Sequence, residues 1–107
     1  MTSAYEAFVV SRWGNSHSNV LGLSDLFVMT AGLGGETGEV LEKLKKYVRD
    51  GEYDRNLFAK ELGDVLFYLT AIALRFEFTL EEIMQINVAK LTDRDARGVM
   101  RGSGDNR

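Results

Sequence analysis

Four acidic side chains in the chain have a spacing that suits metal binding. They form two pairs, Glu36 with Glu39 and Glu61 with Asp64, and the members of each pair are three positions apart. In a helix, this spacing places both carboxylates of a pair on one face. Like charges repel at short range, so we expect such a cluster to hold a hard divalent cation. Because no histidine lies near either pair, the favoured ions are Mg²⁺ and Mn²⁺.

Three basic residues are candidates for binding the phosphates of a metal-bound substrate. Lys43, Lys90 and Arg94 could supply positive charge to the distal phosphate groups. For Lys43, a salt bridge with Glu39 at i, i+4 is an equally good interpretation. For Lys90 and Arg94 the alternative is a solvated helix end, where the helix dipole favours cations.

The aromatic residues near the N-terminus allow two interpretations. Tyr5, Phe8 and Trp13 recur at helical spacing and could stack on a nucleobase, with Trp13 as the candidate for substrate binding. Aromatic residues in such a pattern more often belong to the hydrophobic core. The single histidine, His17, lies among Ser and Asn residues and has no expected role.

Composition excludes several classes of function. The chain has 107 residues, 16 acidic and 13 basic, so we expect one domain that does not bind nucleic-acid polymers. A nucleotide held through metal ions is compatible with this charge. The lack of cysteine excludes disulfides, thiolate zinc sites and a cysteine nucleophile. No apolar run reaches the roughly 18 residues of a membrane span, and the N-terminus lacks signal-peptide features, so we expect a cytoplasmic protein without a membrane partner.

The pattern of apolar residues predicts an all-α domain of four helices over residues 1–97, followed by a mobile tail over 98–107. The chain contains no proline, which fits this fold class. The expected elements are a first helix from Ala4 to Trp13, a polar loop from Gly14 to Gly22, a second helix from a Ser24 cap to about Tyr47, a third from an Asp54 cap to about Phe76, and a fourth that begins at the capping box Thr79–Glu82.

The second and third helices should bring the carboxylates together. A short polar connection around residues 49–54 favours antiparallel packing, so the two acidic pairs would converge from facing helices. The second helix also contains Gly32, Gly34, Gly35 and Gly38, each of which costs about 1 kcal/mol relative to alanine. Close approach of a neighbouring helix or a ligand would explain them. The alternative is a break in the helix near Gly34 and Gly35.

These motifs together resemble the MazG-type all-α NTP pyrophosphohydrolases. The matching stretches are Gly-Leu-Gly-Gly-Glu-Thr-Gly-Glu-Val from Gly32, then Lys43, then Glu61-Leu-Gly-Asp-Val-Leu-Phe-Tyr-Leu, and finally Asn87-Val-Ala-Lys-Leu-Thr-Asp-Arg94. The resemblance covers most of the chain from Leu33 onward. Glycine at positions 32, 34 and 35 departs from the family pattern, in which alanine or bulkier residues are common.

The resemblance implies Mg²⁺-dependent hydrolysis of nucleoside or deoxynucleoside triphosphates to the monophosphate and pyrophosphate, for control or cleansing of the nucleotide pool. It also implies a compact antiparallel four-helix domain that forms a dimer or a dimer of dimers. By matching position, the residues that would hold the metal are Glu36, Glu39, Glu61 and Asp64. One of the three glutamates could also accept the proton of the attacking water. The residues expected to contact phosphates are Lys43, Asn87, Lys90 and Arg94.

Two alternative functions remain open on the sequence. One is a phosphoribosyl-ATP pyrophosphohydrolase, which has similar carboxylate motifs. The other is a non-catalytic helical interaction module with a structural metal site. Release of pyrophosphate separates the two enzymes from the interaction module.

Overall fold

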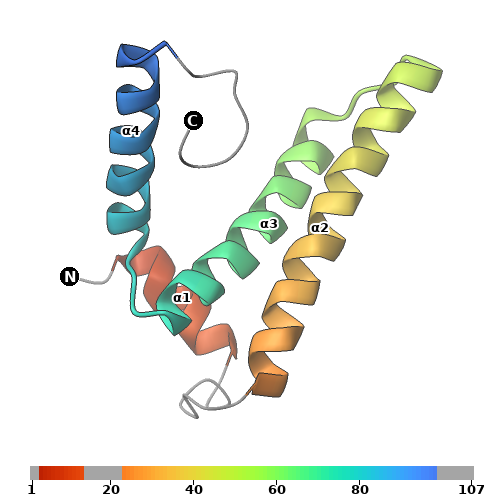
Figure 1. The fold of residues 1–107 in the computed structure, drawn as a ribbon. Helices are drawn as coiled ribbons and strands as arrows, with labels where there is room; N and C mark the ends of the chain where they lie inside the picture. Colours follow the sequence, from red (N-terminus) through yellow and green to blue (C-terminus); the bar gives the residue numbers. More distant parts are fainter. Residues whose placement is uncertain (1–2, 14–22, 99–107) are drawn as a thin grey trace.

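Four α-helices make up the computed structural model, which describes residues 3–13 and 23–98 (Figure 1). The helices are α1 (Ala4–Trp13), α2 (Leu23–Asp50), α3 (Arg55–Arg75) and α4 (Leu80–Ala96). The described residues contain no strand. The predicted all-α fold class is therefore confirmed. The expected loop, with His17, and the tail from residue 99 lie outside the described residues.

The long helices α2 and α3 run antiparallel, side by side (Figure 1). Gly51, in the connection between them, has a φ of 74°, which glycine adopts at little cost. The Asp54 side chain then caps α3, accepting hydrogen bonds from the backbone N–H groups of Asn56 at 3.0 Å and Leu57 at 3.1 Å. The predicted short connection and the Asp54 cap are thus confirmed. Because α2 is continuous from Leu23 to Asp50, the alternative of a break at its glycines is wrong.

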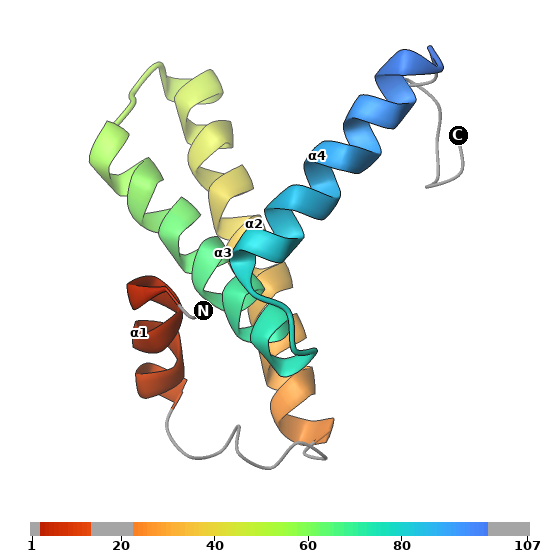
Figure 2. The same ribbon diagram turned by 90° about the vertical axis from the view of Figure 1, so that its left-hand side faces the viewer.

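The hydrophobic core lies where α1 packs against the later part of α3 (Figure 2). Val9 of α1, Met29 of α2 and Ala71 of α3 are buried together. Four partly buried residues surround them, namely Tyr5, Trp13, Phe67 and Ile72. This core fixes α1 across the end of the α2–α3 pair that is distant from their connection.

Helix α4 begins as the sequence predicts but points away from the other helices. The capping box is present: Glu82 N–H donates to Thr79 Oγ1 at 3.1 Å, and Thr79 N–H donates to Glu82 Oε1 at 2.9 Å. Beyond its first turn α4 diverges from α2 and α3 (Figures 1 and 2). The radius of gyration is 16.6 Å, whereas a compact chain of this length would have about 13 Å. The single chain is therefore more open than the compact bundle expected from the sequence.

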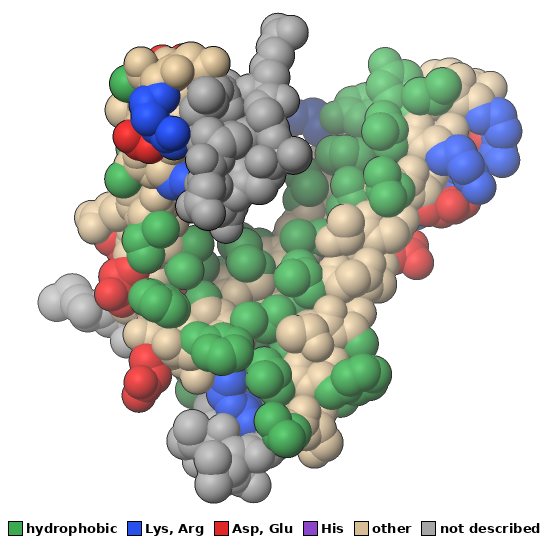
Figure 3. Space-filling model, in the orientation of Figure 1, with side chains coloured by type: hydrophobic (Ala, Val, Ile, Leu, Met, Phe, Trp, Pro, Cys, Tyr) green, Lys and Arg blue, Asp and Glu red, His purple; other side chains and the backbone are tan. Residues whose placement is uncertain are grey.

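This open arrangement leaves much apolar surface in contact with solvent. Figure 3 shows apolar side chains gathered over α3 and in the hollow between α3 and α4. Exposed apolar residues occur on all four helices, including Phe8 on α1, Leu41, Leu44 and Val48 on α2, Leu62 and Leu66 on α3, and Met84 and Val88 on α4. Among the described residues, no helix is both long enough and apolar enough to cross a membrane.

Candidate metal centre

Three of the four predicted carboxylates lie together at the interface of α2 and α3. Glu36 comes from α2, while Glu61 and Asp64 lie one turn apart on the facing side of α3. One carboxylate oxygen from each residue lies within 4.8 Å of the others. Glu36 and Glu61 are half-buried, and Asp64 is exposed. We call these three residues the carboxylate trio.

The fourth carboxylate, Glu39, stands apart from the trio. It is exposed, one turn after Glu36 on α2, and does not belong to the group of converging oxygens. Its charge nevertheless acts on the trio. The pKa of Glu36 is raised, mainly by burial and further by the charges of Asp64, Glu61 and Glu39. Glu36 is thus held in a repulsive field that a bound cation would relieve.

The donor set of the trio suits a hard cation. It consists of carboxylate oxygens alone, without the nitrogen or sulfur atoms that favour zinc or copper. Mg²⁺ requires only a few protein carboxylates because it keeps several water molecules and binds substrate phosphates directly. The residues present therefore fit Mg²⁺ or Mn²⁺, and their role as ligands stays a prediction.

A pocket of about 380 Å³ adjoins the trio and is shared by three helices. Its walls combine acidic, basic and aromatic side chains, namely Tyr5, Phe8 and Arg12 from α1, Glu36 from α2, and Asp64, Phe67 and Tyr68 from α3, with Gly63 between them. The pKa of Tyr5 is raised, first by burial and then by the negative charge of Asp64. The phenol of Tyr5 therefore lies close enough to the trio to feel its charge.

Sequence reasoning did not identify Arg12 as a pocket residue. The signal was present, because Tyr5, Phe8 and Arg12 are separated by three and four positions and so share one face of α1. The aromatic members of this face were recognised as candidates for base stacking. Extending the same face by one turn would have included Arg12.

Tyr68 lines the pocket and packs closely against a glycine of α2. Its ring meets Trp13 edge-on, with centroids 6.4 Å apart, and Phe67 at 5.3 Å. A Cβ atom added to Gly32 would lie 2.6 Å from Tyr68 Cδ1, far inside van der Waals contact. The predicted close approach is thus found at Gly32. At Gly34, Gly35 and Gly38, an added Cβ would have no described atom within 4 Å outside its own stretch of helix.

Trp13 lies on the core side of this aromatic cluster. It is half-buried and packs against the core residues and against Phe67, with ring centroids 6.4 Å apart. Trp13 does not line the pocket that adjoins the trio. Its predicted contact with a substrate base remains a prediction, and the geometry favours packing.

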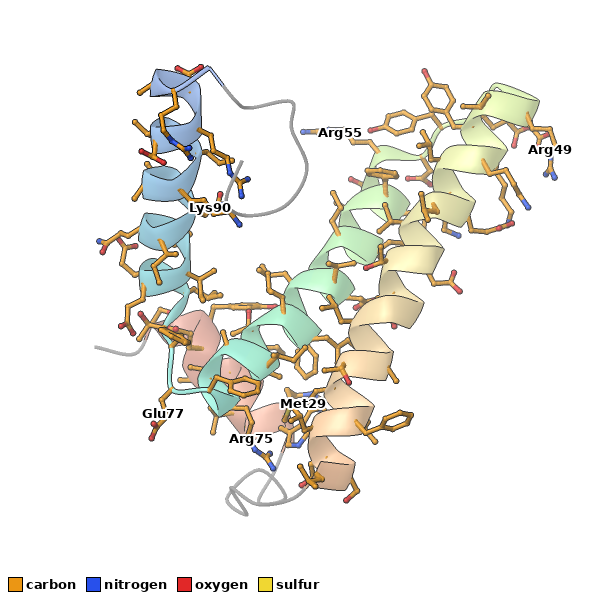
Figure 4. All side chains as sticks on the ribbon, viewed as in Figure 1. Met29, Arg49, Arg55, Arg75, Glu77 and Lys90 are labelled. Carbon is orange, nitrogen blue, oxygen red and sulfur yellow. The ribbon has the colours of Figure 1, made fainter. Side chains whose placement is uncertain are left out.

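The structure places the predicted phosphate-binding residues away from the trio. Lys43 lines a separate pocket at the connection end of α2 and α3, and it forms no salt bridge with Glu39 in the part of the chain that the structure describes. Asn87 is exposed on α4, and Arg94 is buried there with 4% exposure. Lys90 points from α4 into the space between α4 and α3 (Figure 4). For Asn87, Lys90 and Arg94, the divergence of α4 explains why one chain does not bring them to the trio.

Comparison with known proteins agrees with the motifs. A family model described as the MazG nucleotide pyrophosphohydrolase domain matches residues 27–99. The Gene 37 protein of Mycobacterium phage L5 is 40% identical over 90 residues, which is 79% of this chain and 79% of that protein. No solved structure is significantly similar to the chain. The matched family region includes all four carboxylates and the whole of α3 and α4, but not α1.

Proposed function

The chain belongs to the MazG nucleotide pyrophosphohydrolase family, and from this premise we propose that it hydrolyses nucleoside or deoxynucleoside triphosphates to the monophosphate and pyrophosphate, with Mg²⁺ as the cofactor. The observation that carries the proposal is the convergence of Glu36, Glu61 and Asp64 from two helices. A role in controlling or cleansing the nucleotide pool follows from that chemistry.

In the proposed mechanism, carboxylates bind the metal and accept the proton of the attacking water. Glu36, Glu61 and Asp64 hold the cation, which when bound would neutralise phosphate charge and activate a water molecule. Glu39 lies outside the trio and so is free to accept the proton of that water. Phosphoryl transfer to water needs positioning and charge neutralisation rather than a covalent protein nucleophile. The absence of cysteine from the chain is therefore no obstacle.

We also propose that the active form is a homodimer or homotetramer. Leu41 and Val48 on α2 are 62% and 78% exposed, and Leu44 between them is exposed as well. A second copy would cover this α2 strip, defined as Leu41, Leu44 and Val48. It could also bring the basic residues of α4 close to a carboxylate trio. We further propose that the protein acts in the cytoplasm on free nucleotides, not on nucleic-acid polymers or membranes.

Product analysis tests the proposal. The protein is incubated with each common NTP and dNTP in Mg²⁺, and the products are separated. We expect monophosphate and pyrophosphate in equal amounts from a subset of the nucleotides. If no nucleotide is hydrolysed with Mg²⁺ or Mn²⁺, the proposal fails, and phosphoribosyl-ATP becomes the next substrate to test.

A further inference from the structure

Arg12 of α1 occupies a position that the family comparison does not cover. It precedes the matched region 27–99, yet it lines the same pocket as Glu36 and Asp64. Among the described residues, it is the only cation in the lining of that pocket. Its side chain is exposed, and no hydrogen bond or salt bridge to another described residue holds it.

A cation at the position of Arg12 would help to balance the negative charge of the site. A single divalent cation does not neutralise three carboxylates together with a triphosphate chain, so further positive charge is needed beside the metal. The cations predicted for this task do not reach the pocket within one chain, because Lys43 lines another pocket and Lys90 lies on the diverging α4. Arg12 is already in place.

The chemistry of the guanidinium matches a phosphate better than a base or a sugar. Its planar fork can donate two parallel hydrogen bonds to non-bridging phosphate oxygens, and it stays charged at any working pH. Phe8 lies one turn before Arg12 on the same face of α1 and also lines the pocket, where it can pack along the stem of the arginine. The face of α1 thus contributes one charged group to the lining of the pocket that the trio borders.

We propose that Arg12 is a substrate-binding residue that holds the phosphate chain of the metal-bound nucleotide. This inference rests on the proposed function, because it needs the phosphates to enter the pocket that the trio borders. Helix α1 then does more than complete the core. It closes the site with a cation that α2 and α3 do not supply.

The test uses inorganic tripolyphosphate as the probe, since it carries the phosphate chain without a base or sugar. Binding to the full-length protein is measured by titration calorimetry in the presence of Mn²⁺, and Mn²⁺ binding is measured alone. For Arg12→Gln we expect about a 10- to 100-fold loss of affinity for tripolyphosphate, the usual range for hydrogen bonds to a charged group. Affinity for Mn²⁺ alone should be unchanged. Arg12→Lys, which keeps the charge but loses the fork, should show an intermediate affinity.

Arg49→Gln is the matched control. Arg49 is an exposed arginine at the far end of α2, where it pairs with Asp50 at 2.8 Å (Figure 4). Its replacement should leave both affinities as in the wild type. The inference is overturned if wild-type protein does not bind tripolyphosphate with Mn²⁺, if Arg12→Gln binds it as tightly as wild type, or if Arg12→Gln loses Mn²⁺ to the same degree.

The failure of this inference can be told apart from the failure of the proposed function. Tripolyphosphate binding requires no turnover, so it is informative even if no nucleotide is hydrolysed. If wild-type protein releases pyrophosphate and the KM for the nucleotide does not rise in Arg12→Gln, the function stands and the role of Arg12 is wrong. If the function is right and the role is right, KM rises by about the same factor as the tripolyphosphate affinity falls.

Discussion

Glu6 Oε2 of α1 accepts a hydrogen bond of 2.8 Å from the backbone N–H of Leu80, the first residue of α4. The other oxygen of the same carboxylate, Oε1, accepts from the Ser3 backbone N–H at 2.7 Å, so Glu6 ties together the starts of two helices that are distant in sequence. The side chain is buried, with 2% of Glu6 exposed. This contact fixes the point from which α4 leaves the α2–α3 pair.

The Glu6 contact predicts a specific dependence of stability on pH. Hydrogen bonds from Ser3 and Leu80 lower the pKa of Glu6 below its usual value of 4.5. The unfolded chain therefore takes up the proton first as pH falls, and the stabilisation present at neutral pH is lost between 4.5 and the lower folded pKa. We expect Glu6→Gln to melt below wild type at pH 7, with the difference shrinking as pH falls through this window.

Glu77→Gln is the control for that experiment. Glu77 is an exposed glutamate that points away from the helices just before α4 (Figure 4). The melting temperature of the Glu77→Gln variant should follow that of the wild type at every pH. A Glu6→Gln variant that melts with the wild type at pH 7 would contradict the role of Glu6.

Two neighbouring glycines should respond in opposite ways to the same substitution. Gly32→Ala places a methyl group into the ring of Tyr68, so we expect a loss of about 1–3 kcal/mol in the free energy of unfolding. Gly34→Ala meets no described atom within 4 Å and should gain up to about 1 kcal/mol from the better helix propensity of alanine. Urea denaturation of both variants measures their free energies of unfolding relative to the wild type. Equal effects in the two variants would refute the close approach of Tyr68 to Gly32.

The sequence was sufficient to predict the parts of the fold that local chemistry determines. The Asp54 cap, the capping box from Thr79 to Glu82 and the bounds of α1 follow from short-range hydrogen bonds and helical spacing. The convergence of Glu36 with the α3 carboxylates also follows, because a short connection makes two long helices antiparallel. The bounds of α2 were predicted less well. Ser24, expected as its cap, lies inside the helix, which includes Leu23, and the helix ends at Asp50 instead of Tyr47.

The remaining features depend on contacts between distant residues, which no local pattern encodes. The start of α4 is held by the bond between Glu6 and Leu80, 74 positions apart. From there α4 diverges from α2 and α3, which separates Lys90 from the trio. The Ser3-x-x-Glu6 pattern indicates only a cap for α1. The separation of Glu39 from the trio likewise depends on how α2 packs against α3. Glu36 and Glu39 fit the same helical face, so their spacing alone does not tell which of them meets the carboxylates of α3.

Removing one carboxylate of the trio should abolish metal binding and relieve repulsion. For Asp64→Asn we expect the metal-free protein to melt above wild type, because Asp64 and Glu36 repel each other. Wild type should be stabilised by about 2.7 kcal/mol when Mn²⁺ is present at about 100 times its Kd, and the variant should not. Thermal melts with and without Mn²⁺ measure both effects. Glu52→Gln, an exposed change in the α2–α3 connection, should behave as wild type.

Assembly can be tested through the α2 strip. We expect Val48→Glu to weaken self-association, because it places a charge in an apolar surface that a second copy would bury. Asn56→Glu adds the same charge at an exposed position on α3 and should leave assembly unchanged. Sedimentation velocity over a range of concentrations distinguishes the two. A wild-type protein that stays monomeric at every concentration would refute the proposed oligomer.

The most direct test of the central claim is pyrophosphate release from nucleoside triphosphates in Mg²⁺ by wild type and Glu61→Gln side by side. Glu61 is a half-buried member of the trio, and its isosteric amide keeps the shape of the site but removes one charged ligand. We predict stoichiometric pyrophosphate and monophosphate from wild type and a loss of at least about 100-fold in kcat/KM for the variant, the size typical of removing a key electrostatic group. Turnover by Glu61→Gln equal to that of wild type would contradict the assignment of the trio as the catalytic metal site.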